Sequence, residues 1–474
     1  MTATYHVATK EEHMENSRWA GRMLALTVGI VLVVAACGGS TTPPASTGGS
    51  PAAGTTTPSG TAAAGTASGG LSGSITLLEK WPDPNYSPYF QQVVAAYTAA
   101  NPNVKIDLQA VGDQPIKDKL RVLAASKTMP DIYFSWAGDF TKKFVRGGLA
   151  ADLSSYVQNT DWGKGFVPAA LQAFTYDGKV YGIPIDLDAK FFVYNTKIFK
   201  DNGINVPASL ADLLTACDTL KGKGITPIAF GNQYGWPAIH YLTQLNPYLV
   251  APATLAKDYD PATGAFTDPA YATALQSLLD LNSHCLTQNA NGISHESAQA
   301  TFLAGKSAMQ YVESVEFPVF TTKGGASADI ANNWSFFKMP PVSGAAGDPK
   351  VLEGAPDGFL VNPSSQHMDV AIDFLKYFTN QQNAALMTKL NGWLSPVKGS
   401  ATTDNAFPQL IQVIDQINQA DNMAIWLDTV TNIDVANAYL NGAQALLDGS
   451  KTPAAVMADV QAAAVKAKAS ASSQ

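Results

Sequence analysis

Charge is scarce in this 474-residue chain. Only 14% of the residues are charged, and 38 acidic side chains outnumber 30 basic ones, which gives a net charge of −8. A protein that binds nucleic acid needs a basic face, so this class is disfavoured and no nucleic-acid partner is expected. Hydrophobic residues make up 46% of the chain, which is typical of a globular protein. Because one hydrophobic core seldom extends over so long a chain, two domains are expected.

The familiar catalytic motifs are missing as well. There is no H-E-x-x-H and no G-x-S-x-G. Gly305-Lys306-Ser307 resembles the end of a phosphate-binding loop, but Ala300 stands where that motif needs its first glycine. The histidines, including His284 and His295, lack the spacing of metal ligands. The sequence therefore predicts no catalysis, no cofactor and no metal site.

The hydrophobic run at residues 23–36 is too short to cross a bilayer comfortably. Arg18 and Arg22 precede it, as in a signal peptide, so residues 1–36 are expected to be removed; Met14 is an alternative start. Val34-Ala35-Ala36-Cys37 resembles a lipobox, in which cleavage before the cysteine is followed by its acylation. We therefore expect Cys37 to be lipidated. The alternative is a plain secretory signal with a cysteine there by chance.

Residues able to form a core are almost absent from 38–72, where Ser, Thr, Pro, Gly and Ala alternate and Leu71 is the exception. Such a segment cannot offset the entropy of ordering it. Residues 37–72 are therefore expected to act as a flexible tether with a reach of about 30 Å. The working domain is predicted to lie outside the cytoplasmic membrane, held to it only by the lipid.

Cysteine is rare: besides Cys37 the chain has Cys217 and Cys285. The two could pair in an oxidising compartment or remain buried thiols, and their spacing does not decide between these.

Strand and helix signals alternate from residue 74 onward, which predicts an α/β fold with mostly parallel sheets and helices on both faces. Strands are expected at residues 74–78, 104–110, 131–135, 191–194, 226–229, 308–312, 334–338 and 358–361. Helices are expected at residues 89–100, 116–126, 140–147, 210–221, 236–249, 271–283, 297–303, 368–379, 409–420, 435–448 and 453–468.

The segment 176–199 is interpreted as the junction between two hydrophobic units. Asp177-Gly178 is a hairpin signal, and Pro184 ends the strand that follows it. The chain then crosses to the next unit through residues 185–190, and the loops 340–350 and 393–397 are interpreted as further crossings. These crossings divide the chain into lobe I, residues 73–185 and 341–395, and lobe II, residues 186–340 and 396–474.

Tryptophans and carboxylates recur in the loops that follow the predicted strands, where α/β sheets bind their ligands. Aromatic rings can stack on the C–H faces of sugars, while carboxylates accept hydrogen bonds from hydroxyl groups. Each tryptophan taken alone could equally be core packing, and each aspartate a helix cap. Their recurrence predicts a sugar-binding site formed by Trp81, Asp83, Trp136, Asp139, Asp186, Asp188, Trp236, Glu313, Asp357, Trp393 and Trp426.

An ordered set of short segments resembles the extracellular solute-binding protein family 1, the sugar-binding proteins and lipoproteins that serve ABC importers. The segments are Asn101-Pro102-Asn103-Val104, Lys119-Leu120 with Met129-Pro130-Asp131, 134–139 with 148–153, 177–184, Tyr194-Asn195, 302–306 with Ala308-Met309, and 374–378. The resemblance implies a two-lobed, class II periplasmic-binding-protein-like fold whose lobes are joined by a hinge of several crossings. It also implies a monomer that closes on a carbohydrate and delivers it to a permease.

Carried over position by position, the resemblance makes Trp136 and Asp139 a stacking ring and a hydroxyl acceptor. Asp188 matches a hinge carboxylate, and Asp83 and Trp426 match approximately. Val315 departs from the pattern, because the family often has tryptophan there; Trp236 or Trp393 would have to replace it.

Two other functions stay open on the sequence. One is an extracytoplasmic glycosidase that uses two of the carboxylates named above. The other keeps the fold and binds a polyol, phosphosugar or peptide; a phosphosugar is disfavoured because no Lys or Arg cluster is evident near the predicted site.

Overall fold

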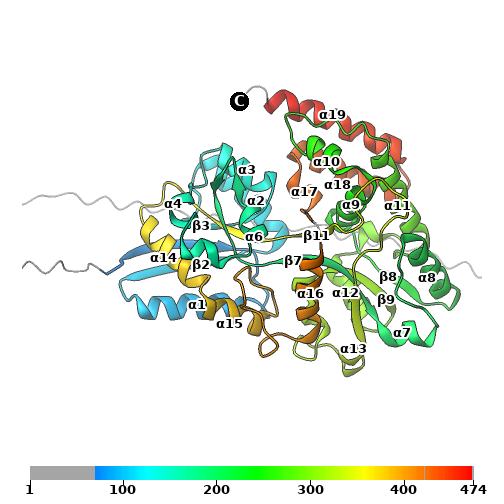
Figure 1. The fold of residues 1–474 in the computed structure, drawn as a ribbon, viewed down its shortest axis with the longest axis horizontal. Helices are drawn as coiled ribbons and strands as arrows, with labels where there is room; N and C mark the ends of the chain where they lie inside the picture. The colour runs from blue at the N-terminus through cyan, green and yellow to red at the C-terminus, as the bar shows by residue number, and fades with distance from the viewer. Residues whose placement is uncertain (1–69, 421, 472–474) are drawn as a thin grey trace, which may run out of the picture. The chain divides into compact units, whose positions relative to one another are not determined.

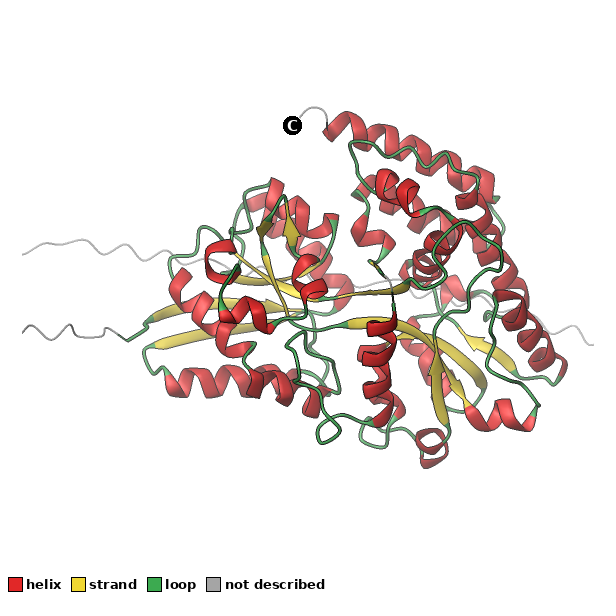
Figure 2. Ribbon diagram, in the orientation of Figure 1, coloured by secondary structure: helices red, strands yellow, loops and turns green. Residues whose placement is uncertain are grey.

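The computed structural model describes residues 70–420 and 422–471 (Figure 1). The expected signal peptide, Cys37 and the tether as far as residue 69 lie outside the described residues. The described part contains two main sheets, each with helices packed beside it (Figure 2).

The first sheet has the strand order β2-β1-β3-β12-β6. Its strands are β1 (Gly73–Glu79), β2 (Val104–Ala110), β3 (Ile132–Trp136), β6 (Gly182–Pro184) and β12 (Asp357–Val361). β1 is parallel to both β2 and β3, as expected from strands joined by helical crossovers, whereas β12 runs antiparallel to β3 and β6.

The helices beside the first sheet lie between its strands and after the last of them. They are α1 (Ser87–Ala100), α2 (Asp113–Ser126), α3 (Asp139–Arg146), α4 (Ser154–Val157), α5 (Asp161–Gly165), α6 (Pro168–Gln172), α14 (Met368–Phe378) and α15 (Gln381–Asn391). Their buried side chains share one hydrophobic core with β1, β3 and β12, and this core extends to Trp81, Trp136 and Trp393. We refer to this unit as the first lobe.

The second sheet has the order β13-β11-β7-β9-β8, with β10 also paired to β7. Its strands are β7 (Asp188–Asn195), β8 (Thr226–Ala229), β9 (Ser307–Glu313), β10 (Trp334–Phe337), β11 (Leu352–Ala355) and β13 (Met423–Ala424). β7 runs antiparallel to β9, β10 and β11, so this sheet is more mixed than expected. The crossings account for the antiparallel β7–β11 pair, because the chain enters β7 from the first sheet and returns to that sheet after β11.

Helices cover the second sheet and form its core together with β7 and β9. They are α7 (Thr196–Asp201), α8 (Leu210–Gly222), α9 (Trp236–Leu249), α10 (Pro252–Asp258), α11 (Ala270–His284), η1 (Ala290–Gly292), α12 (His295–Leu303), η2 (Ser314–Phe320), α13 (Ala328–Asn332), α16 (Pro408–Gln419), α17 (Leu427–Val430), α18 (Ile433–Leu447) and α19 (Pro453–Ala471). We refer to this unit as the second lobe. The alternative left open by the sequence is decided here: Cys217 in α8 forms a disulfide with Cys285, which follows α11.

The predicted hairpin is present. β4 (Thr175–Tyr176) pairs antiparallel with β5 (Lys179–Val180), and Asp177 and Gly178 between them both have positive φ, at 51° and 75°. The first crossing follows at once, between β6 and β7. Asn195 caps α7 as expected, its side chain accepting a hydrogen bond from the backbone N–H of Ile198 at 3.0 Å.

The second crossing lies later than expected. The loop 340–350 leads to β11, which still pairs with β7, and the chain changes sheet only at Pro356. β11 was missed because it is short and contains Gly354, a poor strand former. A Cβ at Gly354 would lie 2.3 Å from the Asp188 carbonyl oxygen, so this glycine allows the two crossing segments to lie side by side. A third passage joins α15 to α16 and pairs with the first through a bridge between Leu187 and Leu394.

Candidate sugar-binding site

A cavity of about 570 Å³ collects residues from both lobes and from the crossings between them. Nine of the predicted site residues line it: Trp81, Asp83, Trp136, Asp188, Trp236, Glu313, Asp357, Trp393 and Trp426. Its volume lies within the range of roughly 300–1,000 Å³ that is usual for small-molecule sites.

Two predicted residues do not line the cavity. Asp139, the first residue of α3, is bound by the Arg146 guanidinium through two hydrogen bonds of 2.7 and 3.1 Å. Asp186 is 1% exposed, and its Oδ1 accepts a hydrogen bond from the Asp357 backbone N–H at 2.9 Å. Asp139 therefore forms an ion pair within the first lobe, and the Asp186 hydrogen bond links one crossing segment to the next.

The first-lobe side of the cavity is a wall of rings packed against rings. The Trp81 ring stacks on Phe90 at 5.3 Å and meets Trp393 at 5.1 Å, and Trp393 is only 1% exposed. Trp393 Nε1 donates to the Val315 carbonyl oxygen at 2.9 Å. These tryptophans therefore present limited surface to the cavity while they fix the wall in place.

Trp136 has its ring surrounded on several sides. Phe134 and Phe140 pack against it edge-on at 4.6 and 4.8 Å. The Nζ atoms of Lys80 and Lys117 each lie 5.0 Å from its ring centroid. A sugar that stacks on Trp136 would compete with these cation–π contacts.

The second-lobe side begins at α9, whose first residue is Trp236. Trp236 is half-buried, and neighbouring Tyr234 is 43% exposed, so these two rings offer more free surface than the first-lobe tryptophans. One turn along α9, His240 lies parallel to the Trp426 ring at 4.6 Å and 9°. This i, i+4 spacing places Trp236 and His240 on one helix face.

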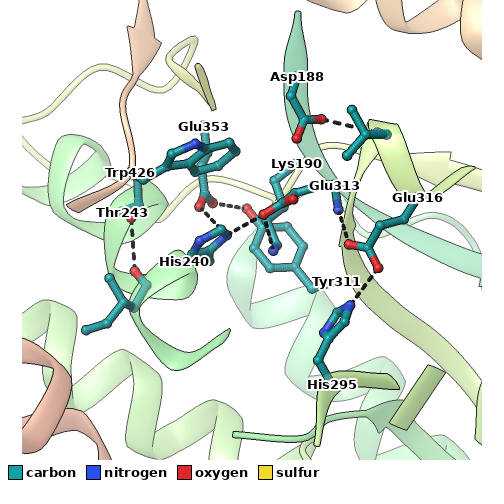
Figure 3. Close-up of polar contacts among 12 residues, drawn as sticks. Asp188, Lys190, His240, Thr243, His295, Tyr311, Glu313, Glu316, Glu353 and Trp426 are labelled. Carbon is teal, nitrogen blue, oxygen red and sulfur yellow. Dashed lines mark hydrogen bonds and ion pairs between the residues drawn. The ribbon is translucent and has the colours of Figure 1, made fainter. Parts of the chain in front are cut away.

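Beneath these rings lies a chain of buried polar groups (Figure 3). Lys190 Nζ is 3.6 Å from a Glu313 oxygen, and His240 Nδ1 lies 3.5 Å from Glu313 and 3.4 Å from Glu353. Tyr311 donates to Glu353 at 2.6 Å. Burial and nearby Lys190 lower the pKa of His240 well below its usual value, and burial raises the pKa of Glu353. Both shifts favour the neutral forms of His240 and Glu353, which disfavours an ion pair between them.

Asp188 is the first residue of β7, and its side chain points into the same region (Figure 3). Its Oδ1 accepts hydrogen bonds from Ser314 Oγ at 2.7 Å and from the Val315 N–H at 3.3 Å. Burial, followed by the charges of Glu313 and Asp186, raises its pKa well above the usual range. On the neighbouring crossing, burial raises the pKa of Asp357 to about 6, although Lys80 at 2.7 Å opposes this.

The sequence showed no cluster of Lys or Arg near the predicted site, but the structure places two lysines there. Lys80, at the end of β1, and Lys117, on α2, both line the cavity. Each is held by carboxylates: Lys80 by Asp357, and Lys117 by Asp113 at 4.0 Å and Asp428 at 3.9 Å. The signal was available, because both lysines lie close to the carboxyl ends of strands β1 and β2, where α/β folds place their ligand sites.

Further lining residues were missed on the second lobe. His295, at the start of α12, contacts Glu316 at 2.6 Å (Figure 3). Burial alone would lower the pKa of His295, but the Glu316 carboxylate outweighs it and raises this pKa. His295 and Glu316 are 21 residues apart with no shared motif, so no sequence signal connected them. His240 could have been found from its helical spacing to Trp236.

Within residues 70–420 and 422–471, no group of three or more His, Cys, Asp or Glu side chains is arranged to hold a metal ion. In the same part of the chain, no helix has both the length and the apolar character that a membrane crossing requires.

Two solved structures share the fold of this chain at low sequence identity. One comes from work on xylan utilization by the thermophilic bacterium Caldanaerobius polysaccharolyticus, with a TM-score of 0.76 and 24% identity over 82% of this chain and 99% of that chain. Another is a chitin oligosaccharide binding protein, with a TM-score of 0.77 and 24% identity over 84% of this chain and 99% of the other. These likenesses identify the two-lobed fold.

Curated relatives match over shorter stretches. A putative binding protein of Brucella abortus is 28% identical over 37% of this chain and 42% of its own length. The maltotriose-binding protein of Pyrococcus abyssi is 29% identical over 27% of this chain and 28% of its own. The xylose/arabinose-binding protein XacG of Haloferax volcanii is 23% identical over 59% and 61%. The chain thus spans less than two thirds of the length of each of these relatives.

The family model for bacterial extracellular solute-binding proteins matches residues 82–385, which is more than half of the chain and includes most strands of both sheets and two of the three passages between them. The chain therefore belongs to the bacterial extracellular solute-binding protein family.

Proposed function

We propose that this chain is the extracytoplasmic substrate-binding subunit of an ABC importer, and that it captures a di- or oligosaccharide in the cavity between its lobes. The single observation that carries this proposal is the composition of that cavity. Aromatic rings and carboxylates from both lobes converge on one space of about 570 Å³, at the carboxyl ends of strands. This pairing of apolar faces with hydrogen-bond acceptors matches the chemistry of a sugar ring.

The relatives support the same ligand class and partner. Matching proteins are named for maltotriose and for xylose and arabinose, and one from Pyrococcus horikoshii is named as an ABC transporter extracellular-binding protein. Because membership of this family points to binding, we assign the cavity carboxylates to hydrogen bonding and not to catalysis. Closure of the lobes about the three passages would enclose the sugar and present the closed form to a permease.

Residues outside the described part complete the proposal. Signal cleavage before Cys37 and its acylation would anchor the protein to the outer face of the membrane, with residues 38–72 as the tether. The first lobe would then comprise 73–185 with β12, α14 and α15, and the second lobe 188–355 with α16 to α19. The protein would act as a monomer.

The experiment is a thermal-shift panel on residues 72–474 with mono-, di- and trisaccharides, and with polyols and peptides as controls. A ligand that binds only the folded state stabilises it by about 2.7 kcal/mol at a hundredfold excess over its Kd. We expect a rise in Tm with one class of sugar and recovery of that sugar unchanged. A shift with peptides or polyols alone would overturn the carbohydrate assignment, and hydrolysis of the bound sugar would establish a glycosidase instead.

A further inference from the structure

One corner of the cavity, around Tyr86, gathers three carboxylates. Burial raises the pKa of the Tyr86 phenol, and the charges of Glu316, Asp83 and Asp188 raise it further. The Tyr86 hydroxyl donates to the Val315 carbonyl oxygen at 3.5 Å, and the Val315 N–H donates to Asp188 at 3.3 Å. These groups therefore share one corner with Glu316, which follows Val315 in the chain. The Tyr86 ring lines the cavity and packs against Trp393 at 4.8 Å, which fixes the position of the corner.

The three carboxylates differ in what already binds them. Glu316 is occupied by His295 at 2.6 Å and by Gln299 at 2.8 Å. Asp83 is exposed and accepts only the Asn85 backbone N–H at 2.7 Å. None of the described lysines, arginines or histidines forms an ion pair with Asp83 or Asp188. Two of the three carboxylates at this corner thus lack a cationic partner.

Asp188 has unused hydrogen-bonding capacity at the cavity. The residue is only 7% exposed, and both of its hydrogen bonds are made by Oδ1. None of the described residues donates a hydrogen bond to Oδ2. Asp188 lines the cavity, and its Oδ2 is not among the fully buried atoms, so this oxygen is available to a donor on a ligand.

The charge of the whole lining points the same way. Eight carboxylates face two lysines; the carboxylates are Asp83, Asp113, Asp188, Glu296, Glu313, Glu316, Asp357 and Asp428. Both lysines are already bound by Asp357, Asp113 and Asp428, and Lys190 beneath the lining is matched with Glu313. None of these cationic side chains is paired with Asp83 or Asp188, so the Tyr86 corner is acidic.

We propose that the preferred ligand is an amino sugar whose protonated amine is bound at the Tyr86 corner, between Asp83 and Asp188. This inference rests on the carbohydrate function proposed above and specifies its substrate class. An ammonium group has three donors and no acceptor, so it can bond to both carboxylates at once. Such charge-assisted bonds are about twice as strong as those of a neutral hydroxyl.

The test compares sugars with one skeleton that differ only at carbon 2. The disaccharides are cellobiose, the β-1,4 dimer of glucosamine, and its N,N′-diacetyl form; glucose, glucosamine and N-acetylglucosamine, together with maltose and its 2-amino-2-deoxy counterpart, extend the series. Isothermal titration calorimetry should show the free amine binding at least about tenfold more tightly than its hydroxyl counterpart. The N-acetyl form, which keeps the nitrogen but loses the charge, should show no such gain.

Variants test whether Asp83 and Asp188 cause the preference for the amine. Asp188→Asn and Asp83→Asn should each reduce the preference for the amine over the hydroxyl severalfold, with Asp83→Asn the safer test of folding because Asp83 is exposed. Asp107→Asn on β2, which removes the same charge outside the cavity lining, should leave the preference unchanged. Equal or tighter binding of the neutral sugars would overturn the amine proposal and leave the carbohydrate function standing. Absence of binding by any sugar, charged or neutral, would overturn both.

Discussion

The two sides of the cavity use aromatic residues in different ways. On the first lobe, Trp81 and Trp393 pack on other rings and are 8% and 1% exposed. On the second lobe, Trp236 is half-buried and lies over Lys190, whose Nζ is 5.0 Å from the ring centroid. The first arrangement resembles the inside of a hydrophobic core, whereas the second is a ring with free surface above a polar layer. A tryptophan at a ligand site can therefore serve mainly the fold or mainly the ligand, and burial separates the two roles.

The largest expected effect comes from a substitution in the aromatic wall on the first-lobe side. Trp393→Ala should lower the free energy of unfolding by about 3–5 kcal/mol, because it removes a fully buried indole and leaves a cavity beside Trp81. Urea unfolding followed by fluorescence and circular dichroism measures the change. Trp393→Phe, which keeps a ring but loses the hydrogen bond to Val315, should cost clearly less. A Trp393→Ala protein of unchanged stability with lost sugar affinity would reverse the assigned role.

Each side of the cavity also has a buried carboxyl group nearby. On the first-lobe side this is Glu79, the last residue of β1, which precedes Lys80 and Trp81. Its Oε1 has no partner, and burial raises its pKa from 4.5 to about 7, although the Trp81 backbone N–H opposes this. Because the folded pKa is the higher one, the folded state keeps a proton that the unfolded chain releases. The loss of folding stability caused by Glu79 is therefore absent below about pH 4.5 and grows as the pH rises to 7.

Glu79→Gln cannot ionise, so it should be more stable than the parent by roughly 2–3 kcal/mol at pH 8 and nearly equal to it at pH 4.5. Chemical unfolding at a series of pH values measures this difference. Asp188, Asp186 and Glu353 also have raised pKa values, so part of the parent's pH dependence should persist in the variant. A difference that stays constant between pH 4.5 and 8 would contradict the assignment to Glu79.

Much of the architecture could be predicted from local pattern. The hairpin at Asp177-Gly178, the buried strand β7 and the long helices α9 and α18 all carry strong periodicity or turn signals. The position of the second crossing could not be predicted, because Leu352–Ala355 is a short strand that forms only through its pairing with β7 and β13. Non-local pairing of this kind leaves little trace in the sequence.

The sequence predicted which types of residue line the candidate site, but not how far each side chain is exposed there. Nine of the predicted site residues line the cavity, and those that follow strands do so because topology brings the carboxyl ends of strands together. Asp139 was misplaced because a guanidinium seven residues later binds it, and sequence spacing alone does not show which of several nearby carboxylates an arginine selects. The burial of Trp393 and the lysines over Trp136 depend on tertiary packing.

The two sides meet at Gly138, in the loop between β3 and α3, and this contact offers a way to separate them. Gly138 has φ of 90°, and a Cβ there would lie 2.7 Å from the Thr429 carbonyl oxygen and 2.8 Å from the Val430 Cα. Gly138→Ala should therefore push α3 away from α17, weaken sugar binding severalfold and cost about 1–3 kcal/mol of stability. Calorimetric titration and urea unfolding measure the two effects.

Gly148 provides the matched control. It also has positive φ, 63°, but a Cβ there meets nothing within 4 Å. Gly148→Ala should therefore cost about 1 kcal/mol of stability through backbone strain alone and leave sugar affinity unchanged. Equal losses of affinity in both variants would show that strain, and not the contact between the two sides, sets the affinity.

The smallest expected effect concerns Trp236, the half-buried tryptophan on the second-lobe side of the cavity. Trp236→Ala should weaken sugar binding by about 1–2 kcal/mol, through the loss of a stacking face, while its Tm changes much less than that of Trp393→Ala. Trp236→Phe should recover most of the affinity, because the ring face is what the sugar contacts. If Trp236→Ala instead unfolded as readily as Trp393→Ala, the main role of the indole would be to pack on Lys190 and the polar groups beneath it and so stabilise the fold. The free ring surface would then have to be sought at Tyr234, which is 43% exposed.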